Sequence, residues 1–246
     1  MTVKKILVSQ PQPSTDKSPY HLLAEKHNTE VVFRPFIKVE GLSAKEFRQQ
    51  RINLAEFTAV IFTSRTAVDH FFHLCEEMRI TIPATMKYFC LSEPIANYIQ
   101  KYTIFRKRKI FFSKTGKFAD LMPAILKHSS DNYLLVASDV NKGDDASVLQ
   151  ANNIKFTQGV LYRTVSNDFT PEEAFDYDML VFFSPQGIES LLKNFPDFQQ
   201  GDIKIAAFGA STAKAVTDAG LRVDVQAPTV QAPSMPAAID LFLSQD

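Results

Sequence analysis

The chain has 246 residues, of which 45% are hydrophobic and 22% are charged, and its 27 basic residues balance 27 acidic ones. That length and apolar content suffice for one large core or two of ordinary size. A net charge of zero argues against a DNA- or RNA-binding surface, because such surfaces are usually basic. No apolar run approaches the roughly 20 residues of a membrane span, and the first residues are too polar for a signal peptide. We therefore expect neither nucleic acid nor membrane as a partner.

Short apolar runs alternate with runs of helical period along the whole chain. The expected strands are residues 5–8, 30–33, 59–62, 87–91, 110–112, 133–137, 160–165, 179–183, 204–208 and 222–225. Helical spacing is clearest between the strands at residues 68–78 and 188–195. Strands of about five residues separated by single helices predict right-handed βαβ units and parallel sheets covered on both faces. Ten strands are many for one sheet, so we expect two sheets of about five strands.

Two further features of the pattern concern the organisation of the chain. Residues 59–68 (AVIFTSRTAV) match residues 179–188 (MLVFFSPQGI) in type, and each is followed by a helix and another strand. This favours two related domains, although α/β units can look alike without duplication. The proline-rich stretches 10–19 and 227–236 are expected to be loops. Cys75 and Cys90 lie in apolar segments, which predicts buried thiols in a reducing compartment and a cytoplasmic protein.

Small polar residues follow most of the expected strands. They are Thr63-Ser64, Ser92, Ser113 to Gly116, Ser138-Asp139, Ser184-Pro185 and Gly209 to Thr212. In an open parallel sheet these positions lie at the carboxyl edge, where ligands bind. A hydroxyl at the start of a helix either caps that helix or helps its free N–H groups to hold an anion. Capping is the better interpretation of any single serine, but six such positions on one edge favour a cleft for a ligand with many negative groups.

Other motifs limit the kind of ligand and chemistry. Residues 114–118 (KTGKF) lack the glycine and final hydroxyl of a G-x-x-x-x-G-K-S/T loop, and no G-x-G-x-x-G or G-x-S-x-G occurs. Carboxylates therefore suit the edge better than nucleotides, with phosphate left open. His70 and His73, near Glu76 and Glu77, are too few for a zinc site, and we expect no metal. The basic run at residues 106–109 is interpreted as a solvated loop.

Several segments together resemble the uroporphyrinogen-III synthase family. They are residues 60–68 (VIFTSRTAV), 160–164 (VLYRT), 181–187 (VFFSPQG), 205–215 (IAAFGASTAKA) and 219–221 (AGL). The resemblance implies an α/β fold with two doubly wound parallel-sheet domains joined by a two-stranded β-ladder linker. Residues 1–35 and 166–246 would form a discontinuous first domain and residues 36–165 an inserted second domain, with the active-site cleft between them. The pattern of strands alone places a boundary near the midpoint of the chain.

The resemblance also implies an activity. Members of the family cyclise hydroxymethylbilane, a linear tetrapyrrole with eight carboxylates, to uroporphyrinogen III, with inversion of ring D and loss of water. This is a lyase reaction of porphyrin and heme biosynthesis that uses no cofactor. The substrate would be the chain's small-molecule partner, and a monomer is expected because thin linkers join the domains of the family.

The family's pattern assigns roles to particular residues. Its candidate general acid is a tyrosine that matches Tyr162, and a phenol stays protonated at neutral pH and can donate. The substrate-binding positions that match are Thr63, Ser64, Arg65, Ser184, Pro185, Gln186, Gly187, Gly209, Ala210, Ser211 and Thr212. They would hold carboxylates or ring nitrogens, and positioning of the flexible substrate would supply most of the catalysis.

Two departures from the family's pattern keep alternatives open. Gln10 stands where members commonly have Arg, and residues 90–96 (CLSEPIA) stand where they commonly have a Gly-x-x-Thr-Ala turn. Glu93 would repel a carboxylate, for which Arg65, Lys114 or Lys142 could compensate. One alternative is therefore a non-catalytic protein of the same fold that binds a tetrapyrrole or another polyanion. Another is a small-molecule transferase of an unrelated doubly wound fold, which would bind a nucleotide or cofactor tightly.

Overall fold

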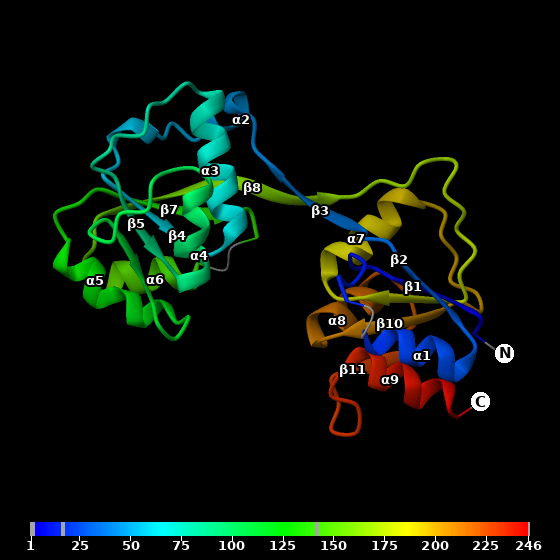
Figure 1. Ribbon diagram of the computed structural model, residues 1–246. Helices are drawn as coiled ribbons and strands as arrows, with labels where there is room; N and C mark the ends of the chain where they lie inside the picture. The colour runs from blue at the N-terminus through cyan, green and yellow to red at the C-terminus, as the bar shows by residue number, and fades with distance from the viewer. Residues whose placement is uncertain (1–2, 16–17, 141–142, 246) are drawn as a thin grey trace. The chain divides into compact units, whose positions relative to one another are not determined.

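A computed structural model describes residues 3–15, 18–140 and 143–245, so Lys142 lies outside the described residues. Contacts divide the chain into two compact units. The terminal unit comprises Met1–Lys38 and Val165–Asp246, and the middle unit comprises Val39–Thr164. The chain passes from one unit to the other within β3 (Ile37–Gly41) and β8 (Phe156–Ser166), which are neighbours in one sheet (Figure 1). The divisions expected from the resemblance, at residues 35–36 and 165–166, lie close to these points.

The terminal unit contains a five-stranded sheet in the order β11-β10-β9-β1-β2, and its four pairs of neighbouring strands are parallel. Its strands are β1 (Lys5–Val8), β2 (Glu30–Phe33), β9 (Met179–Phe182), β10 (Lys204–Phe208) and β11 (Val225–Ala227). Its helices are α1 (Pro19–His27), α7 (Pro185–Asn194), α8 (Ala210–Asp218) and α9 (Met235–Leu243). The hydrophobic residues of each strand alternate between the two faces. Ile6 and Val8 pack with α1 and α9, whereas Leu7 between them packs with α7 and α8.

The middle unit contains a six-stranded sheet in the order β3-β8-β7-β4-β5-β6. Its other strands are β4 (Ala59–Phe62), β5 (Lys87–Cys90), β6 (Ile110–Phe112) and β7 (Tyr133–Ser138). Its helices are α2 (Ala44–Arg48), α3 (Arg65–Glu77), α4 (Glu93–Tyr98), α5 (Met122–Lys127) and α6 (Asp144–Ala151), with short 3₁₀ turns at Leu54–Glu56, Ile99–Lys101 and Phe118–Leu121. Val60 and Phe62 of β4 pack with α2, α3 and α4, whereas Ala59 and Ile61 pack with α5 and α6.

The expected α/β class and the pair of predominantly parallel sheets are confirmed. Burial on both faces explains why the central strands read as continuous apolar runs, since all four residues of β4 are inaccessible to solvent. The same holds for β9. This is the pattern that indicated strands in the sequence.

Some expected strand limits are wrong. The last strand was expected at residues 222–225 but is β11, which begins at Val225. The residue before it, Asp224, accepts hydrogen bonds through its carboxylate from the Ile205 N–H at 2.9 Å and the Gln200 amide at 3.0 Å. The Asp224 carboxylate thus accepts the hydrogen bond of the Ile205 N–H in place of a backbone carbonyl. β8 begins at Phe156, earlier than the expected residue 160, and β3 was not expected as a strand from its own half-polar sequence.

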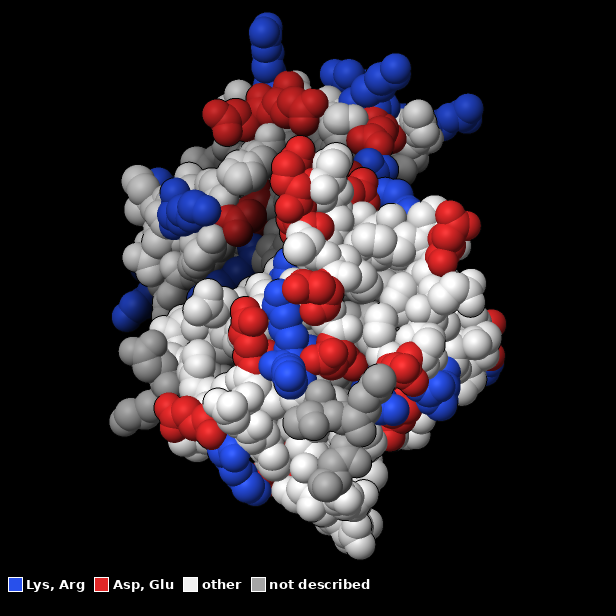
Figure 2. Space-filling view, turned by 90° about the vertical axis from the view of Figure 1, so that its right-hand side faces the viewer, with Lys and Arg blue, Asp and Glu red and all other residues white. Residues whose placement is uncertain are grey.

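The proline-rich stretches were expected to be loops, and this is only partly correct. Pro19 and Pro236 lie in the first turns of α1 and α9, so both proline-rich stretches end in helix starts and are not loops throughout. In the described part of the chain, no helix is long and apolar enough to span a membrane. Cys75 and Cys90 are free and buried. On the face that Figure 2 shows, acidic and basic side chains are interspersed among uncharged residues.

Candidate functional site

The carboxyl edge of the middle sheet carries the first group of expected site residues. Thr63 and Ser64 connect β4 directly to α3, and Arg65 is the first residue of that helix. Ser64 is the N-cap of α3, and its hydroxyl accepts a hydrogen bond from the Ala67 N–H at 3.0 Å. Ser64 therefore caps its own helix, as the conservative interpretation of the sequence expected. Thr63 and Ser64 are half-buried and Arg65 is exposed.

Tyr162 lies at the same edge, on β8. Its partner across the ladder is Ser138, the last residue of β7. Its hydroxyl lies 3.5 Å from the Ser64 hydroxyl, which is a long and weak hydrogen bond. Because no closer acceptor holds it among the described residues, the Tyr162 O–H is available to donate to a ligand. The structure thus brings Tyr162 and Ser64 together, although 98 residues separate them in the sequence.

His70 fixes the ring of Tyr162 from one side. The two rings are stacked with centroids 5.2 Å apart and planes 21° apart. A close approach of β3 holds the imidazole in turn, since a Cβ atom added at Gly41 would lie only 2.7 Å from His70 Nδ1. Burial lowers the pKa of His70 below its ordinary value of 6.5, His73 lowers it further, and Asp69 partly opposes the shift. The imidazole stacked on Tyr162 is therefore neutral at pH 7.

The lowered pKa of His70 predicts a loss of stability in mild acid. The unfolded chain takes up this proton near pH 6.5, whereas the folded unit does so only at lower pH. The unfolded state thus binds more protons just below pH 6.5, so the free energy of unfolding is retained above that pH and falls as the pH decreases through it. Urea unfolding at about pH 7.5 and about pH 5.5 measures the difference. His70→Gln should reduce that difference for the middle unit. An unchanged difference between the two pH values in this variant would contradict the assignment.

Arg65 adjoins a network centred on Asp69. The Asp69 carboxylate accepts hydrogen bonds from the hydroxyls of Tyr98 and Tyr102 and from Lys101 at 2.9 Å. Burial by itself raises the pKa of Asp69, but these hydrogen bonds outweigh it and lower the pKa overall. The Arg65 guanidinium lies over the Tyr98 ring, 5.5 Å from its centroid. No carboxylate among the described residues pairs with Arg65, so its guanidinium can pair with an anionic group of a ligand.

In the terminal unit, a second group of expected site residues follows β9. Ser184 is the N-cap of α7, yet its side chain makes no capping hydrogen bond. It is half-buried, as are Pro185 and Gln186. Gly187 is buried, and a Cβ atom there would lie 3.0 Å from the Phe182 ring. The glycine therefore allows α7 to pack closely on β9, whereas the Ser184 hydroxyl is left for a ligand.

The third group follows the neighbouring strand, β10. Gly209 has φ 86° and ψ 151°, a conformation that only glycine adopts readily. This turn starts α8, which packs against α7, with Ala210 and Ser211 exposed at its start. Thr212 is 1% exposed, so its side chain belongs to the core and only its backbone N–H can serve a ligand. Gly209 to Thr212 and Ser184 to Gly187 thus begin adjacent helices at one edge of one sheet.

The two cap serines should respond differently to substitution. Ser64→Ala removes a capping bond and should lower the free energy of unfolding by about 1 kcal/mol. Ser184→Ala removes no such bond, and the change should stay within about 0.5 kcal/mol. Chemical denaturation of both variants measures the contrast. A loss for Ser184→Ala as large as for Ser64→Ala would show that Ser184 has a structural role after all.

Other residues singled out in the sequence contribute less. Ser92 caps α4 without a side-chain hydrogen bond, and the Ser113 hydroxyl accepts from the Gly116 N–H at 3.1 Å within its own turn. No group of three or more His, Cys, Asp or Glu side chains in the described ranges could hold a metal ion. The roles of His70 and Asp69 were missed, because helical spacing places a residue on a face but does not reveal which strand it meets.

Two α/β units, each with small polar residues and helix starts at the carboxyl edge of a parallel sheet, define a protein suited to anionic ligands. The family model described as uroporphyrinogen-III synthase HemD matches residues 18–237. The chain therefore belongs to the uroporphyrinogen-III synthase family, and the resemblance found in its sequence is confirmed. Membership indicates an enzyme of tetrapyrrole synthesis.

The first of two similar solved structures shares this fold. A uroporphyrinogen-III synthetase from Helicobacter pylori is 18% identical, with 99% of this chain and 100% of that chain covered and a TM-score of 0.58. A mutant uroporphyrinogen III synthase from Thermus thermophilus is 16% identical, with 99% and 100% covered and a TM-score of 0.49. No curated protein matches the chain.

Proposed function

We propose that the chain is a uroporphyrinogen-III synthase, a lyase that cyclises hydroxymethylbilane to uroporphyrinogen III with inversion of ring D. Family membership supports the substrate class. The observation that carries the proposal for this chain is the Tyr162 hydroxyl at the carboxyl edge, held by a stacked neutral His70 and only weakly engaged by Ser64. A phenol in that state can give its proton to a leaving hydroxyl.

In the proposed reaction, Tyr162 donates its proton as the C–O bond of the hydroxymethyl group breaks, and water leaves. The carbon so activated is attacked by the substituted carbon of ring D. The resulting spiro intermediate breaks and recloses with ring D inverted, and the proton lost on closure restores the phenol. No cofactor takes part in this scheme. Because the bilane can close without inversion on its own, the protein's main task is to hold one folded conformation.

We assign carboxylate binding to both strand edges. In the middle unit Arg65 supplies the exposed cation, and Thr63 and Ser64 supply hydroxyls. In the terminal unit the free hydroxyl of Ser184 and the first N–H groups of α7 and α8 suit carboxylates, because helix starts carry unpaired donors and partial positive charge. Gln186 of α7 and Ser211 of α8 would supply further polar groups for the substrate at these two helix starts. We further propose a monomer located in the cytoplasm.

A second candidate is a non-catalytic protein that binds a tetrapyrrole. It is favoured by the α4 start, where Glu93 occupies the first helical turn next to the free Ser92 hydroxyl. A carboxylate in that place opposes an anionic group at this edge alone, so the bilane would still bind at the other helix starts but would not be held in the conformation that reacts. Such a protein would bind the bilane without changing its product.

The test is to generate hydroxymethylbilane in situ with the protein present and to measure the ratio of uroporphyrinogen III to uroporphyrinogen I. A synthase raises the III isomer far above the spontaneous background. A ratio equal to the background, with binding of the bilane retained, would replace the enzyme proposal with the binding-protein candidate.

A further inference from the structure

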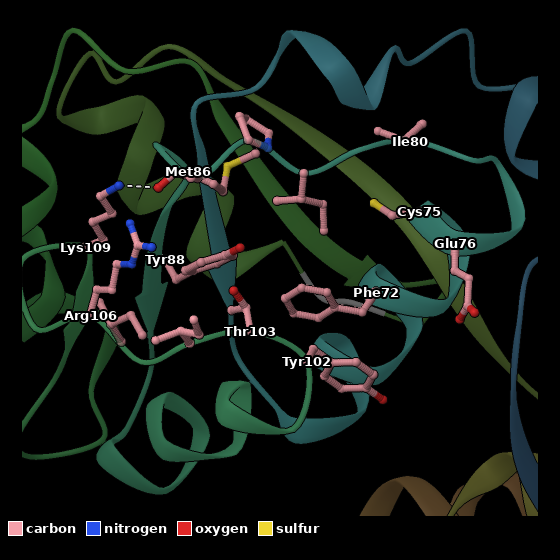
Figure 3. Close-up of a pocket in the computed structure, with 15 residues that line it drawn as sticks. Phe72, Cys75, Glu76, Ile80, Met86, Tyr88, Tyr102, Thr103, Arg106 and Lys109 are labelled. Atoms are coloured by element: carbon pink, nitrogen blue, oxygen red, sulfur yellow. Dashed lines mark hydrogen bonds between the residues drawn. The ribbon is translucent and has the colours of Figure 1, made fainter.

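A pocket lies at the amino-terminal edge of the middle sheet, at the opposite ends of the strands from Ser64. It has a volume of about 420 Å³ and is lined by the segments that lead into β5 and β6 and by α3 (Figure 3). Its size falls within the range of pockets for small ligands, roughly 300–1,000 Å³. Thr63, Ser64, Arg65 and Tyr162 take no part in its lining, although Tyr102, which does line it, also donates a hydrogen bond to Asp69.

The inner wall of the pocket is apolar and rigidly packed. Phe72, Met86 and Tyr88 line it, and each is at most 8% exposed. The Phe72 ring stacks on Tyr102 with centroids 4.6 Å apart and planes 4° apart, and its centroid lies 6.1 Å from that of Tyr88. Phe72 comes from α3, Tyr88 from β5 and Met86 from the position just before β5, and all three belong to one buried hydrophobic cluster of the unit. The wall is therefore preformed and does not require a ligand to order it.

Two hydroxyl groups, those of Tyr88 and Thr103, belong to residues that line the pocket. Figure 3 shows the Tyr88 hydroxyl pointing into the pocket. Neither hydroxyl has a hydrogen-bond partner within the described parts of the chain, although Tyr88 is only 5% exposed. Burial raises the pKa of Tyr88, and Cys75 and Cys90 raise it further. The phenol is thus a donor at neutral pH that lacks an acceptor.

One end of the pocket is cationic. Arg106 and Lys109 lie together there, within the basic run 106–109 (Figure 3). Lys109 donates to the Ala84 carbonyl, and among residues 3–15, 18–140 and 143–245 neither cation pairs with a carboxylate. The acidic residue of the lining, Glu76, lies at the opposite end. The pocket therefore offers an apolar body and a positive end, which match a hydrophobic anion.

We propose that this pocket binds a small hydrophobic carboxylic acid in its ionised form. The apolar part lies against Phe72, Met86 and Tyr88, and the carboxylate lies at Arg106 and Lys109. A guanidinium presents two parallel N–H donors that match the two oxygens of a carboxylate. The acid would be a ligand additional to the tetrapyrrole, at a separate place in the fold, so the proposal does not depend on the synthase activity.

Calorimetric titration of the full chain with two probes tests the proposal. The probes are decanoate, an aliphatic acid, and 2-naphthoate, an aromatic acid, and the neutral control is decanamide. We expect at least one acid to bind and decanamide to bind at least about tenfold more weakly, since the neutral amide cannot form the charge-assisted hydrogen bonds of a carboxylate. The acid that binds more tightly shows whether the apolar part of the pocket prefers an aliphatic or an aromatic group. Binding of neither acid, or equal binding of decanamide, would overturn the proposal.

Three charge-reversal variants locate the site. Arg106→Glu should weaken binding at least about tenfold. Arg108→Glu is the matched control, because Arg108 is exposed in the same basic run but does not line the pocket, and its affinity should change less than about twofold. Arg65→Glu tests the strand edge instead. Equal losses for Arg106→Glu and Arg108→Glu, or a loss for Arg65→Glu alone, would overturn the proposal; thermal melts confirm that each exposed-site variant stays folded.

Discussion

Tyr162→Phe is expected to lower the rate of uroporphyrinogen III formation by about 100- to 10,000-fold, the usual contribution of a general acid. Phenylalanine keeps the ring that stacks on His70 but removes the proton that the proposed reaction transfers. Among the residues that the structure describes, the only hydrogen bond lost is the long one to Ser64, so stability should change little. A coupled assay that separates the III and I isomers gives the rate, and a thermal melt gives the stability.

The matched control is Tyr177→Phe, another half-buried tyrosine, which precedes β9 in the terminal unit. It should retain the wild-type rate. Full activity in Tyr162→Phe would mean that positioning alone accounts for catalysis. A parallel loss of activity and melting temperature would assign Tyr162 a structural role.

Phe36→Ala is expected to lower the free energy of unfolding of the terminal unit by about 3–5 kcal/mol, as for other fully buried aromatic residues. Phe36 is 1% exposed, and its ring lies 5.1 Å from Phe169 and 5.2 Å from Phe182, measured between centroids. Its carbonyl accepts hydrogen bonds from the Asn167 N–H and the Ser190 hydroxyl. Truncation therefore leaves a cavity beside the segment that leads into β3.

Because the chain has no tryptophan, urea unfolding is best followed by far-ultraviolet circular dichroism and fitted with two transitions. The transition of the terminal unit should move and that of the middle unit should stay. Phe36→Leu, which refills part of the cavity, should show a smaller loss. A shift below about 1 kcal/mol for Phe36→Ala would contradict the packing described for this residue.

Much of the fold could be predicted because burial on both faces leaves a direct mark on a parallel strand. The runs at residues 5–8, 59–62 and 204–208 coincide with β1, β4 and β10. β3 leaves no such mark, since Lys38 and Val39 are exposed and Glu40 is only half-buried. β11 was misplaced because the Asp224 side chain substitutes for a backbone partner, and such a substitution depends on residues 200 and 205, which lie far away in the sequence.

The candidate site, like the fold, could be predicted from the sequence only in part. The small polar residues at strand ends were visible in the sequence, because a parallel sheet puts the ends of its strands on one edge. Their individual states were not visible. Ser64 caps its helix and Ser184 does not, although each follows a buried strand and starts a helix. Thr212, expected among the substrate-binding residues, has its side chain buried in the core.

The sequence by itself determined the α/β class, the family and the positions at which polar groups leave the sheets, because these depend on local period and on short motifs. Only the tertiary structure decided that His70 stacks on Tyr162, that Gly41 makes room for it, and that Arg106 and Lys109 meet an apolar wall at the opposite edge. Such contacts join residues far apart in the chain, and packing selects them from many arrangements that share one hydrophobic pattern.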